Sequence, residues 1–243
     1  MAAVQVWQRF HNSSRHPIEV VYAFPLPENS AVSDLRMIIG ERIIHSDVMR
    51  RDDARQTYEE ARTAGHTAAL LEQERPNLFT QSVTNVAPGE DVVVEIRYLQ
   101  TLTYDSGEYE LVFPLVVGPR YVPDSVPDAA RISPPIAGPG VRTGNDVSIE
   151  IDAQAGPPIL SYTVPTHAVE ASLDAGRLHV TLASRAELPN RDFVLRYRVA
   201  GPEPSASLLL GAPDATGQGH YLMVVHPPAI DVDAEVGRRE VIF

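Results

Sequence analysis

Apolar and polar side chains alternate along most of the first half of the chain. Val4, Val6 and Phe10 fall on one face of such a segment, whereas Trp7 falls on the other. Because successive side chains of a strand point to opposite faces, this period of two predicts strands that bury one face. Strands are expected at residues 4–10, 18–26, 35–39, 43–48, 68–72, 78–86, 92–98 and 108–114. The first half of the chain is therefore predicted to be mainly β.

One segment follows the period of a helix instead. Ala54, Tyr58 and Ala61 lie three or four residues apart and would form a narrow buried stripe. Gly65 is placed to end this helix, because glycine readily adopts the left-handed conformation that follows a last turn. We expect one helix over residues 52–64, packed through Tyr58.

The start of this helix carries signals of its own. Asp53 is followed three residues later by Gln56, which matches the capping box of a helix N-terminus. Arg55 and Glu59 are four residues apart, so we expect them to pair on the exposed side of the helix.

Turns and aromatic positions complete the pattern of the first half. Pro25 is expected to end its strand, because proline has no N–H to donate to a neighbouring strand. Pro88 and Gly89 suit the central positions of a type II turn. Tyr22 and Tyr98 lie on apolar strand faces and are predicted to belong to the core.

The second half of the chain is again β-rich but is preceded by a different kind of segment. Proline and glycine are concentrated in residues 118–144, which is typical of a connector. The clearest strands after it are residues 147–151, 178–182, 193–199, 221–225 and 240–243. Residues 201–219 are expected to form a loop.

Composition narrows the classes of partner and chemistry. The net charge of −12 disfavours nucleic acid, because phosphate binding requires clustered basic side chains. No apolar run approaches 18 residues, so membrane insertion by this chain is not expected. The absence of cysteine excludes disulfides, thiol nucleophiles and thiolate metal sites.

No motif for catalysis or metal binding stands out. None of the eight histidines has a partner at the i, i+4 spacing of a helical zinc site. Asp231 and Asp233, with Asp214, could form a loose calcium site, but a solvated acidic loop is favoured because no EF-hand spacing follows. Neighbouring carboxylates such as Glu59 and Glu60 point apart on a helix. We therefore predict no catalytic, cofactor-binding or metal-ligating residues.

Many short motifs in the first half occur in the order found in one known family. They include residues 17–27, 54–61, 69–77, 79–80, 85–90 and 119–123. With these motifs, residues 1–123 resemble a VIT domain (vault protein inter-alpha-trypsin inhibitor domain). The resemblance implies an antiparallel β-sandwich with one covering helix. The residues that carry its structural motif are Tyr22, Phe24, Pro25, Tyr58, Gly65, Phe79, Pro88, Gly89, Tyr98, Arg120 and Tyr121. Arg120 is interpreted as a structural residue that pairs with an acidic group at the end of the domain.

The second half resembles the segment between VIT and von Willebrand A domains in bacterial multidomain proteins, mainly through residues 188–197. The domain organisation expected is a VIT domain over 1–123, a connector over 124–146, a small β-rich segment over 147–200, a loop over 201–219 and end strands over 220–243. Residues 239–243 look like the first strand of an A domain. We expect a chain truncated at both ends, with self-association through open sheet edges.

The resemblance implies a non-catalytic interaction and scaffolding module of a VIT–von Willebrand A type adhesion or assembly protein, with an unknown protein partner. A carbohydrate-binding β-sandwich is the alternative, although its usual display of several aromatic rings is at odds with a single Trp. A hydrolase is the least favoured. The sequence does not identify the compartment. An exported or cell-envelope location would need a signal outside this chain.

Overall fold

The computed structural model describes residues 1–47, 49–75, 78–115, 146–199, 201, 203–213 and 217–228. The chain divides into two compact units. The first is built mainly from Met1–Leu102, and the second from Thr103–Val112, Asp146–Leu188 and the chain after residue 192. Within the described residues no helix is long and apolar enough to cross a membrane.

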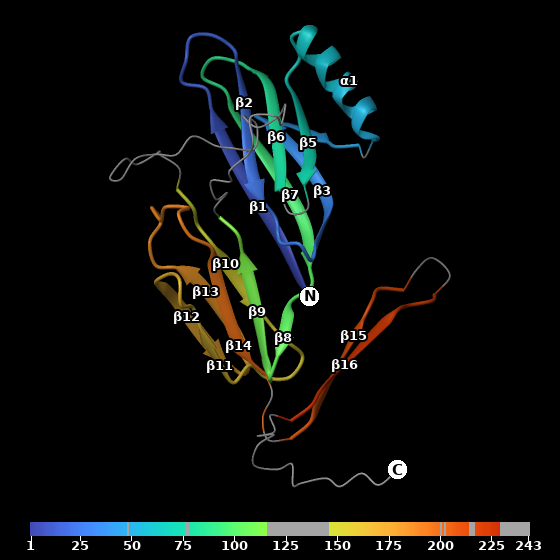
Figure 1. Ribbon diagram of the computed structural model, residues 1–243, viewed down its shortest axis with the longest axis vertical. Coiled ribbons are helices and arrows are strands. Elements are labelled where there is room, and N and C mark those ends of the chain that lie inside the picture. The colour runs from blue at the N-terminus through green and yellow to red at the C-terminus, as the bar shows by residue number, and fades with distance from the viewer. Residues whose placement is uncertain are drawn as a thin grey trace, which may run out of the picture. The chain divides into compact units, whose positions relative to one another are not determined.

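The first unit contains two antiparallel sheets and one helix (Figure 1). Its elements are β1 (Ala2–His11), β2 (Ile18–Pro25), β3 (Ser30–Ile39), β4 (Arg42–His45), α1 (Arg51–Thr63), β5 (Ala68–Arg75), β6 (Leu78–Val86) and β7 (Asp91–Gln100). Sheet A has the strand order β1-β7-β3-β4, and sheet B has the order β2-β6-β5. Both sheets contribute to one apolar core, so the unit is the antiparallel β-sandwich expected from the sequence.

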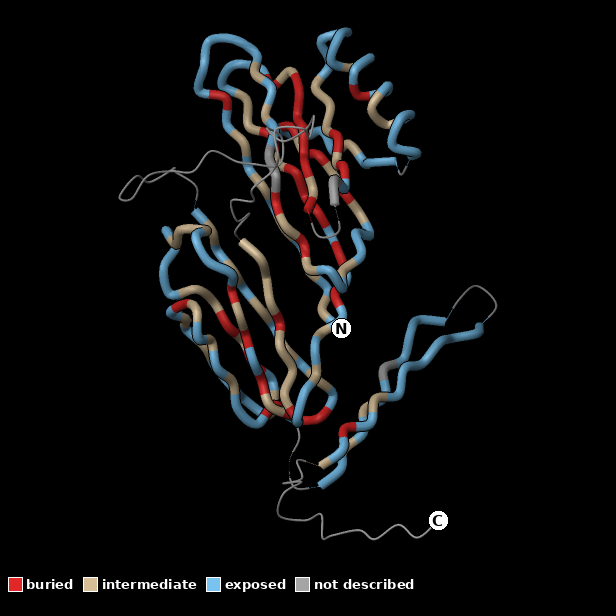
Figure 2. The backbone as a smooth tube through the Cα atoms, viewed as in Figure 1, coloured by how far each residue is buried: buried red, intermediate tan, exposed pale blue. Residues whose placement is uncertain are grey.

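The core of this sandwich follows the alternation in the sequence. On β7 the even positions from Val92 to Tyr98 are at most 1% exposed, and Met37 on the neighbouring β3 is buried beside them. Phe24 stacks on Phe79 across β2 and β6, with ring centroids 6.1 Å apart. Figure 2 marks the buried residues of this unit in red along its strands.

The helix lies where the periodicity places it and covers sheet B through contacts with β5. Tyr58 is its buried residue, and Gly65 has the predicted positive φ of +78°. The backbone N–H of His66 donates to the carbonyl of Ala61, and that of Gly65 donates to Arg62. These two bonds form the Schellman arrangement that satisfies the last carbonyls of a helix.

Two expectations about the helix are wrong. Asp53 is not the N-cap, because the helix begins two residues earlier and Arg50 caps it without a side-chain hydrogen bond. Arg55 does not pair with Glu59. Its guanidinium reaches a buried carboxylate on β5 instead, and Glu59 accepts a bond from Arg62 at 2.8 Å.

The predicted turn at Pro88–Gly89 is present. Gly89 has a φ of +74°, and the N–H of Glu90 donates to the carbonyl of Ala87 at 3.1 Å. Pro25 is the last residue of β2, as the missing N–H of proline predicted.

The second unit contains two further antiparallel sheets and a hairpin. Its elements are β8 (Thr103–Asp105), β9 (Glu108–Phe113), β10 (Glu150–Ala153), β11 (Ser161–Thr163), β12 (Val169–Asp174), β13 (Arg177–Leu182), β14 (Phe193–Arg198), β15 (Ser205–Leu210) and β16 (Tyr221–His226). Sheet C has the order β11-β14-β9-β8 and sheet D the order β10-β13-β12, while β15 pairs with β16. Sheets C and D each bury one face, which is typical of a sandwich.

The second unit departs from the sequence expectations in several places. β8 and β9, which the resemblance places in the first domain, lie in sheet C, where β9 is next to β14 and β8 is at the edge. β15 occupies Ser205–Leu210, inside the segment expected to be a loop. The short strands β11 and β12 were not predicted. The connector over 124–145 and the end strand over 240–243 lie outside the described residues.

Candidate functional site

A buried carboxylate lies on the solvent-facing side of sheet A. β7 is the second strand of that sheet, between β1 and β3. Because side chains alternate along a strand, Val94 and Ile96 point into the core and Glu95 points out. Glu95 is nevertheless only 3% exposed. A charged group on an outer face becomes this buried only when neighbouring side chains close over it.

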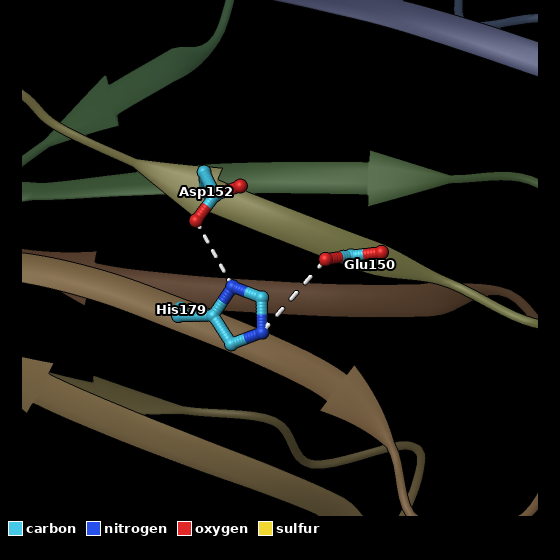
Figure 3. A group of neighbouring side chains, drawn as sticks. All are labelled: Glu150, Asp152 and His179. Carbon is cyan, nitrogen blue, oxygen red and sulfur yellow. Dashed lines mark hydrogen bonds and ion pairs between the residues drawn. The ribbon is translucent and has the colours of Figure 1, made fainter.

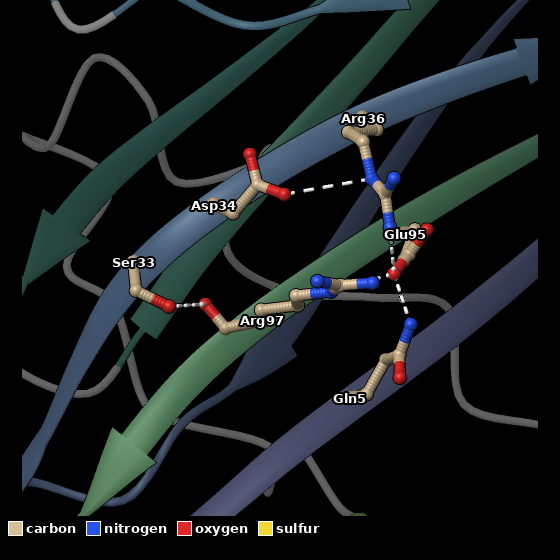
Figure 4. A network of polar contacts seen from close by, with 6 residues as sticks. All are labelled: Gln5, Ser33, Asp34, Arg36, Glu95 and Arg97. Carbon is tan, nitrogen blue, oxygen red and sulfur yellow. Dashed lines mark hydrogen bonds and ion pairs between the residues drawn. The ribbon is translucent and has the colours of Figure 1, made fainter. Parts of the chain in front are cut away.

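Long polar side chains from three strands surround this carboxylate (Figure 4). Arg36 on β3 donates from Nη2 to Oε1 of Glu95 at 2.6 Å, and Arg97 on β7 donates from Nε at 2.8 Å. The side-chain amide of Gln5 on β1 donates to the same oxygen. Arg36 also lies 3.4 Å from a carboxylate oxygen of Asp34.

The charge of Glu95 is stabilised despite its burial. Burial by itself would raise the pKa of the carboxyl, because it disfavours the charged form. The hydrogen bonds from Arg36, Arg97 and Gln5 outweigh this effect and hold the pKa of Glu95 below its ordinary value. The network therefore links β1, β7 and β3 across the sheet surface and gives this face a fixed shape.

Exposed apolar side chains flank the network on the same face. Trp7 stands opposite Glu95 in the register of β1 and β7 and is 60% exposed. Val93, Ile38 and Ile43 form one row across β7, β3 and β4, and Ile43 at the end of the row is exposed. We call this surface of sheet A the outer face. It combines a tryptophan and arginines, which are enriched in energetically important protein–protein contacts, with aliphatic side chains that add apolar area.

The contact between α1 and sheet B contains a second polar network. Arg51 and Arg55 bond to Oε1 of the buried Glu72 on β5 at 3.1 and 2.5 Å. The hydroxyl of Tyr58 donates to Glu19 at 3.0 Å. Burial and this hydrogen bond raise the pKa of Tyr58. These residues hold the helix in place.

A shallow depression of about 350 Å³ lies beside the end of α1. Its lining residues are Pro17, Ile18, Glu19, Arg62, Thr63, Thr84 and Asn85. The polar groups here already have partners. Asn85 donates to the carbonyls of Arg62 and His66, both at 3.0 Å, and Glu19 accepts from Tyr58. The depression holds no nucleophile next to a base, so its polar groups serve the end of the helix.

Sheet D brings together one group of metal-ligating side chains (Figure 3). Glu150 and Asp152 lie two residues apart on β10, and His179 stands opposite Asp152 on β13. His179 Nδ1 is 2.9 Å from Asp152, and its Nε2 is 4.0 Å from Glu150. Both carboxylates are exposed. Such an open group with one nitrogen ligand offers a cation little protection from water, and the contact between His179 and Asp152 is equally explained as a cross-strand hydrogen bond.

The expected motif residues occupy structural positions. Phe24, Tyr58 and Tyr98 are buried, and Phe79 packs partly buried against the same core. Tyr22 pairs in register with Gln81 on β6. The predicted positions Arg120 and Tyr121 lie outside the described residues. So do the aspartates at 214, 231 and 233.

Sequence reasoning missed two important residues. The alternation along β7 indicates that Glu95 faces solvent. Side chains from the paired strands β1 and β3 cover it, and the sequence alone does not show this pairing. Asn12 is the second, and no pattern in the sequence marks it as buried. It is fully buried, and its amide donates to the carbonyls of His16 and Val86, both at 2.8 Å. The feature of the sequence that indicates its role is a polar residue in a turn next to an apolar strand.

Comparisons with known proteins agree with this architecture. Residues 1–98 match the family model of the vault protein inter-alpha-trypsin domain. The chain is 36% identical over 119 residues to protein mono-ADP-ribosyltransferase PARP4 of Mus musculus, a match that covers 49% of this chain and 6% of that protein. It is 35% identical over 124 residues to von Willebrand factor A domain-containing protein 5A of Rattus norvegicus, covering 50% of this chain and 15% of that protein.

A third relative belongs to the inhibitor proteins for which the domain is named. The chain is 26% identical over 111 residues to inter-alpha-trypsin inhibitor heavy chain H2 of Homo sapiens, covering 45% of this chain and 12% of that protein. The chain thus spans a small part of the length of each curated relative. Residues 1–98, with two antiparallel sheets and a covering helix, are a vault protein inter-alpha-trypsin (VIT) domain.

Proposed function

We propose that this chain is a non-catalytic protein-binding module of a VIT–von Willebrand A type protein, and that the outer face of sheet A is its binding surface. One observation carries the proposal. A strongly exposed tryptophan stands beside an arginine–carboxylate network that fixes the surface under it. A rigid surface loses little conformational entropy on binding, so more of the free energy of its contacts contributes to the affinity.

The choice of a protein partner rests on the chemistry of this face. Trp7 and Ile43 provide apolar area, and Arg9 and Arg36 provide donors with a fixed geometry. Relatives that contain von Willebrand factor A domains make such a domain the first partner to test. The relative that is named as an ADP-ribosyltransferase matches this chain over 6% of its length, which does not transfer that activity to the chain.

Isothermal titration with the von Willebrand factor A domain of the rat relative tests the proposal. Trp7→Ala and Ile43→Glu should each weaken binding at least about tenfold, the effect expected of a central contact. Leu173→Glu is the matched control, because Leu173 is an exposed apolar residue of the second unit. Binding that is absent, or that all three substitutions leave unchanged, would contradict the assignment of this face.

Carbohydrate binding is tested with the same protein. Trp7 is the only tryptophan of the chain, so its fluorescence reports this face alone. A single ring offers one stacking position, whereas sugar-binding surfaces usually provide several. We expect no change in Trp7 emission on titration with chitin or cellulose oligosaccharides. A saturable change would favour the carbohydrate-binding alternative.

A further inference from the structure

The hairpin β15–β16 exposes a continuous apolar surface on one of its faces. Three cross-strand pairs share that face, and every member is exposed. The pairs are Ala206 with Val225, Leu208 with Met223, and Leu210 with Tyr221. We call these six residues the apolar ladder. Leu210 and Tyr221 are 76% and 74% exposed, and none of the six side chains is charged.

The other face of the hairpin holds it to the rest of the second unit. His226 is buried, and its Nε2 lies 2.9 Å from the hydroxyl of Tyr109 on β9. The rings of Tyr104 and Tyr109 meet the imidazole edge-on at 5.5 and 5.7 Å. Ser207 packs so closely on Gly156 that a Cβ on this glycine would come within 2.2 Å of it. These contacts lie at the end of the hairpin next to His226. Leu222, further along the same face, is 44% exposed, whereas the ladder face is exposed along its whole length.

A two-stranded hairpin that exposes such a face is poorly stabilised by itself, because isolated hairpins are marginal in water. The ladder presents roughly 500 Å² of apolar surface, if each large side chain offers on the order of 100 Å². This value lies near the upper range of apolar patches on monomeric proteins, which is about 300–600 Å². The surface therefore has the size of an interface.

We propose that the apolar ladder is the seam of a homodimer. The side chains of the ladder grow in size along the hairpin, from Ala206 and Val225 at one end to Leu210 and Tyr221 at the other. When two copies pack face to face around a two-fold axis that runs across the strands, the bulky end of each copy meets the small end of the other. The graded surface thus complements itself, as a two-fold interface requires.

The absence of charge on the ladder limits the cost of association there. The chain carries a net charge of −12, which opposes the association of two copies over the rest of their surface. The ladder carries no charge and requires no desolvation of ionised groups. A strongly charged partner would lose hydration here without gaining a counter-charge. A second ladder, which has the same two-residue apolar repeat, avoids this cost.

The expected dimer is weak. Two ladders bury about 1,000 Å² in total, which is near the lower limit of specific interfaces. Sedimentation equilibrium of the full chain should show an average mass that rises from 26.6 kDa towards twice that value between about 1 and 100 µM. The inference does not depend on the function proposed for sheet A, which lies in the other unit.

Two matched variants test the seam. Leu208→Glu places a charge at the centre of the ladder and should weaken dimerisation at least about thirtyfold, because the charge would be buried without a partner. Leu160→Glu adds the same charge at a leucine of similar exposure outside the ladder, 53% against 57%, and should leave dimerisation unchanged. Circular dichroism and melting curves check that both variants fold.

A charge pair tests the two-fold register directly. Leu210→Lys and Ala206→Glu should each weaken self-association, because each places a charge opposite an apolar side chain. A mixture of these two variants should associate more tightly than either alone, since the new lysine and glutamate would then face each other. A chain that is monomeric at 100 µM would overturn the proposal. Association that survives Leu208→Glu, or that Trp7→Glu abolishes instead, would place the seam elsewhere and also overturn it.

Discussion

Tyr58 fixes α1 on sheet B in two ways, through the packing of its ring and through the hydrogen bond of its hydroxyl. Two substitutions of this residue separate these contributions. The ring is 6% exposed and packs in the middle of the helix, while its hydroxyl donates to Glu19 at 3.0 Å. Tyr58→Ala removes both contributions and should lower the free energy of unfolding by about 4 kcal/mol, the usual loss for a large buried aromatic side chain. Tyr58→Phe removes only the hydroxyl. Glu19 is 41% exposed and can be rehydrated, so this loss should be about 1 kcal/mol.

Urea unfolding, followed by the fluorescence of Trp7 and by circular dichroism, measures both losses. Trp7 lies in the same unit as the helix and is the only tryptophan, so its signal follows that unit alone. Gln56→Ala, on the exposed side of α1, is the control and should change the stability by less than about 0.5 kcal/mol. A loss below about 1 kcal/mol for Tyr58→Ala would show that the helix is not held through this ring.

Three further predictions concern buried polar groups and metal ions. The buried amide of Gln81 has no hydrogen-bond partner among the residues that the structure describes, so Gln81→Leu should raise the urea stability by about 1 kcal/mol, and a loss would reveal a missing partner. The pKa of Glu95 is lower in the folded chain than its ordinary 4.5. Its contribution to the stability of the fold is therefore present above pH 4.5 and is lost as the pH falls through the folded pKa. Glu95→Gln should therefore lose less stability than the parent chain between about pH 5 and pH 3; equal losses would contradict the network. The melting temperature should be the same in EDTA, calcium and zinc, and a zinc-dependent rise that His179→Ala removes would contradict the ion-pair interpretation of sheet D.

The fold of the first unit follows from its sequence because local signals and tertiary packing agree there. The alternation around Val94 and Ile96, the helical spacing through Tyr58 and the glycine at position 65 all lie where the structure uses them. Each signal depends on neighbouring residues only, so it can be read without knowing which strands pair.

The errors arise where distant residues decide the outcome. Arg55 pairs with Glu72 rather than with its neighbour on the helix, because sheet B places a buried carboxylate within reach. The sequence predicts a loop where β15 lies. The segment forms a strand because it pairs with β16, which lies beyond a connecting segment. Short strands such as β11 contain too few residues to show a period of two.

The candidate sites are harder to predict from the sequence than the fold, because they depend on which strands pair. Glu95 is buried because Gln5 and Arg36 come from strands on either side of it, and these residues lie 90 and 59 positions away in the sequence. The group formed by Asp152 and His179 brings together residues 27 positions apart. A search for helical spacing between histidines does not find such a group. The apolar ladder likewise becomes visible only when two strands are placed in register.

The most direct test of the central claim is the indole N–H resonance of Trp7 in a ¹⁵N-labelled chain. A chain with one tryptophan gives one such signal, and this signal belongs to the outer face of sheet A. On addition of the von Willebrand factor A domain, we expect the resonance to shift or broaden with saturation, while the amides of α1 remain unchanged. An indole signal that stays in place while other amides of the chain shift would contradict the claim that the outer face binds the partner.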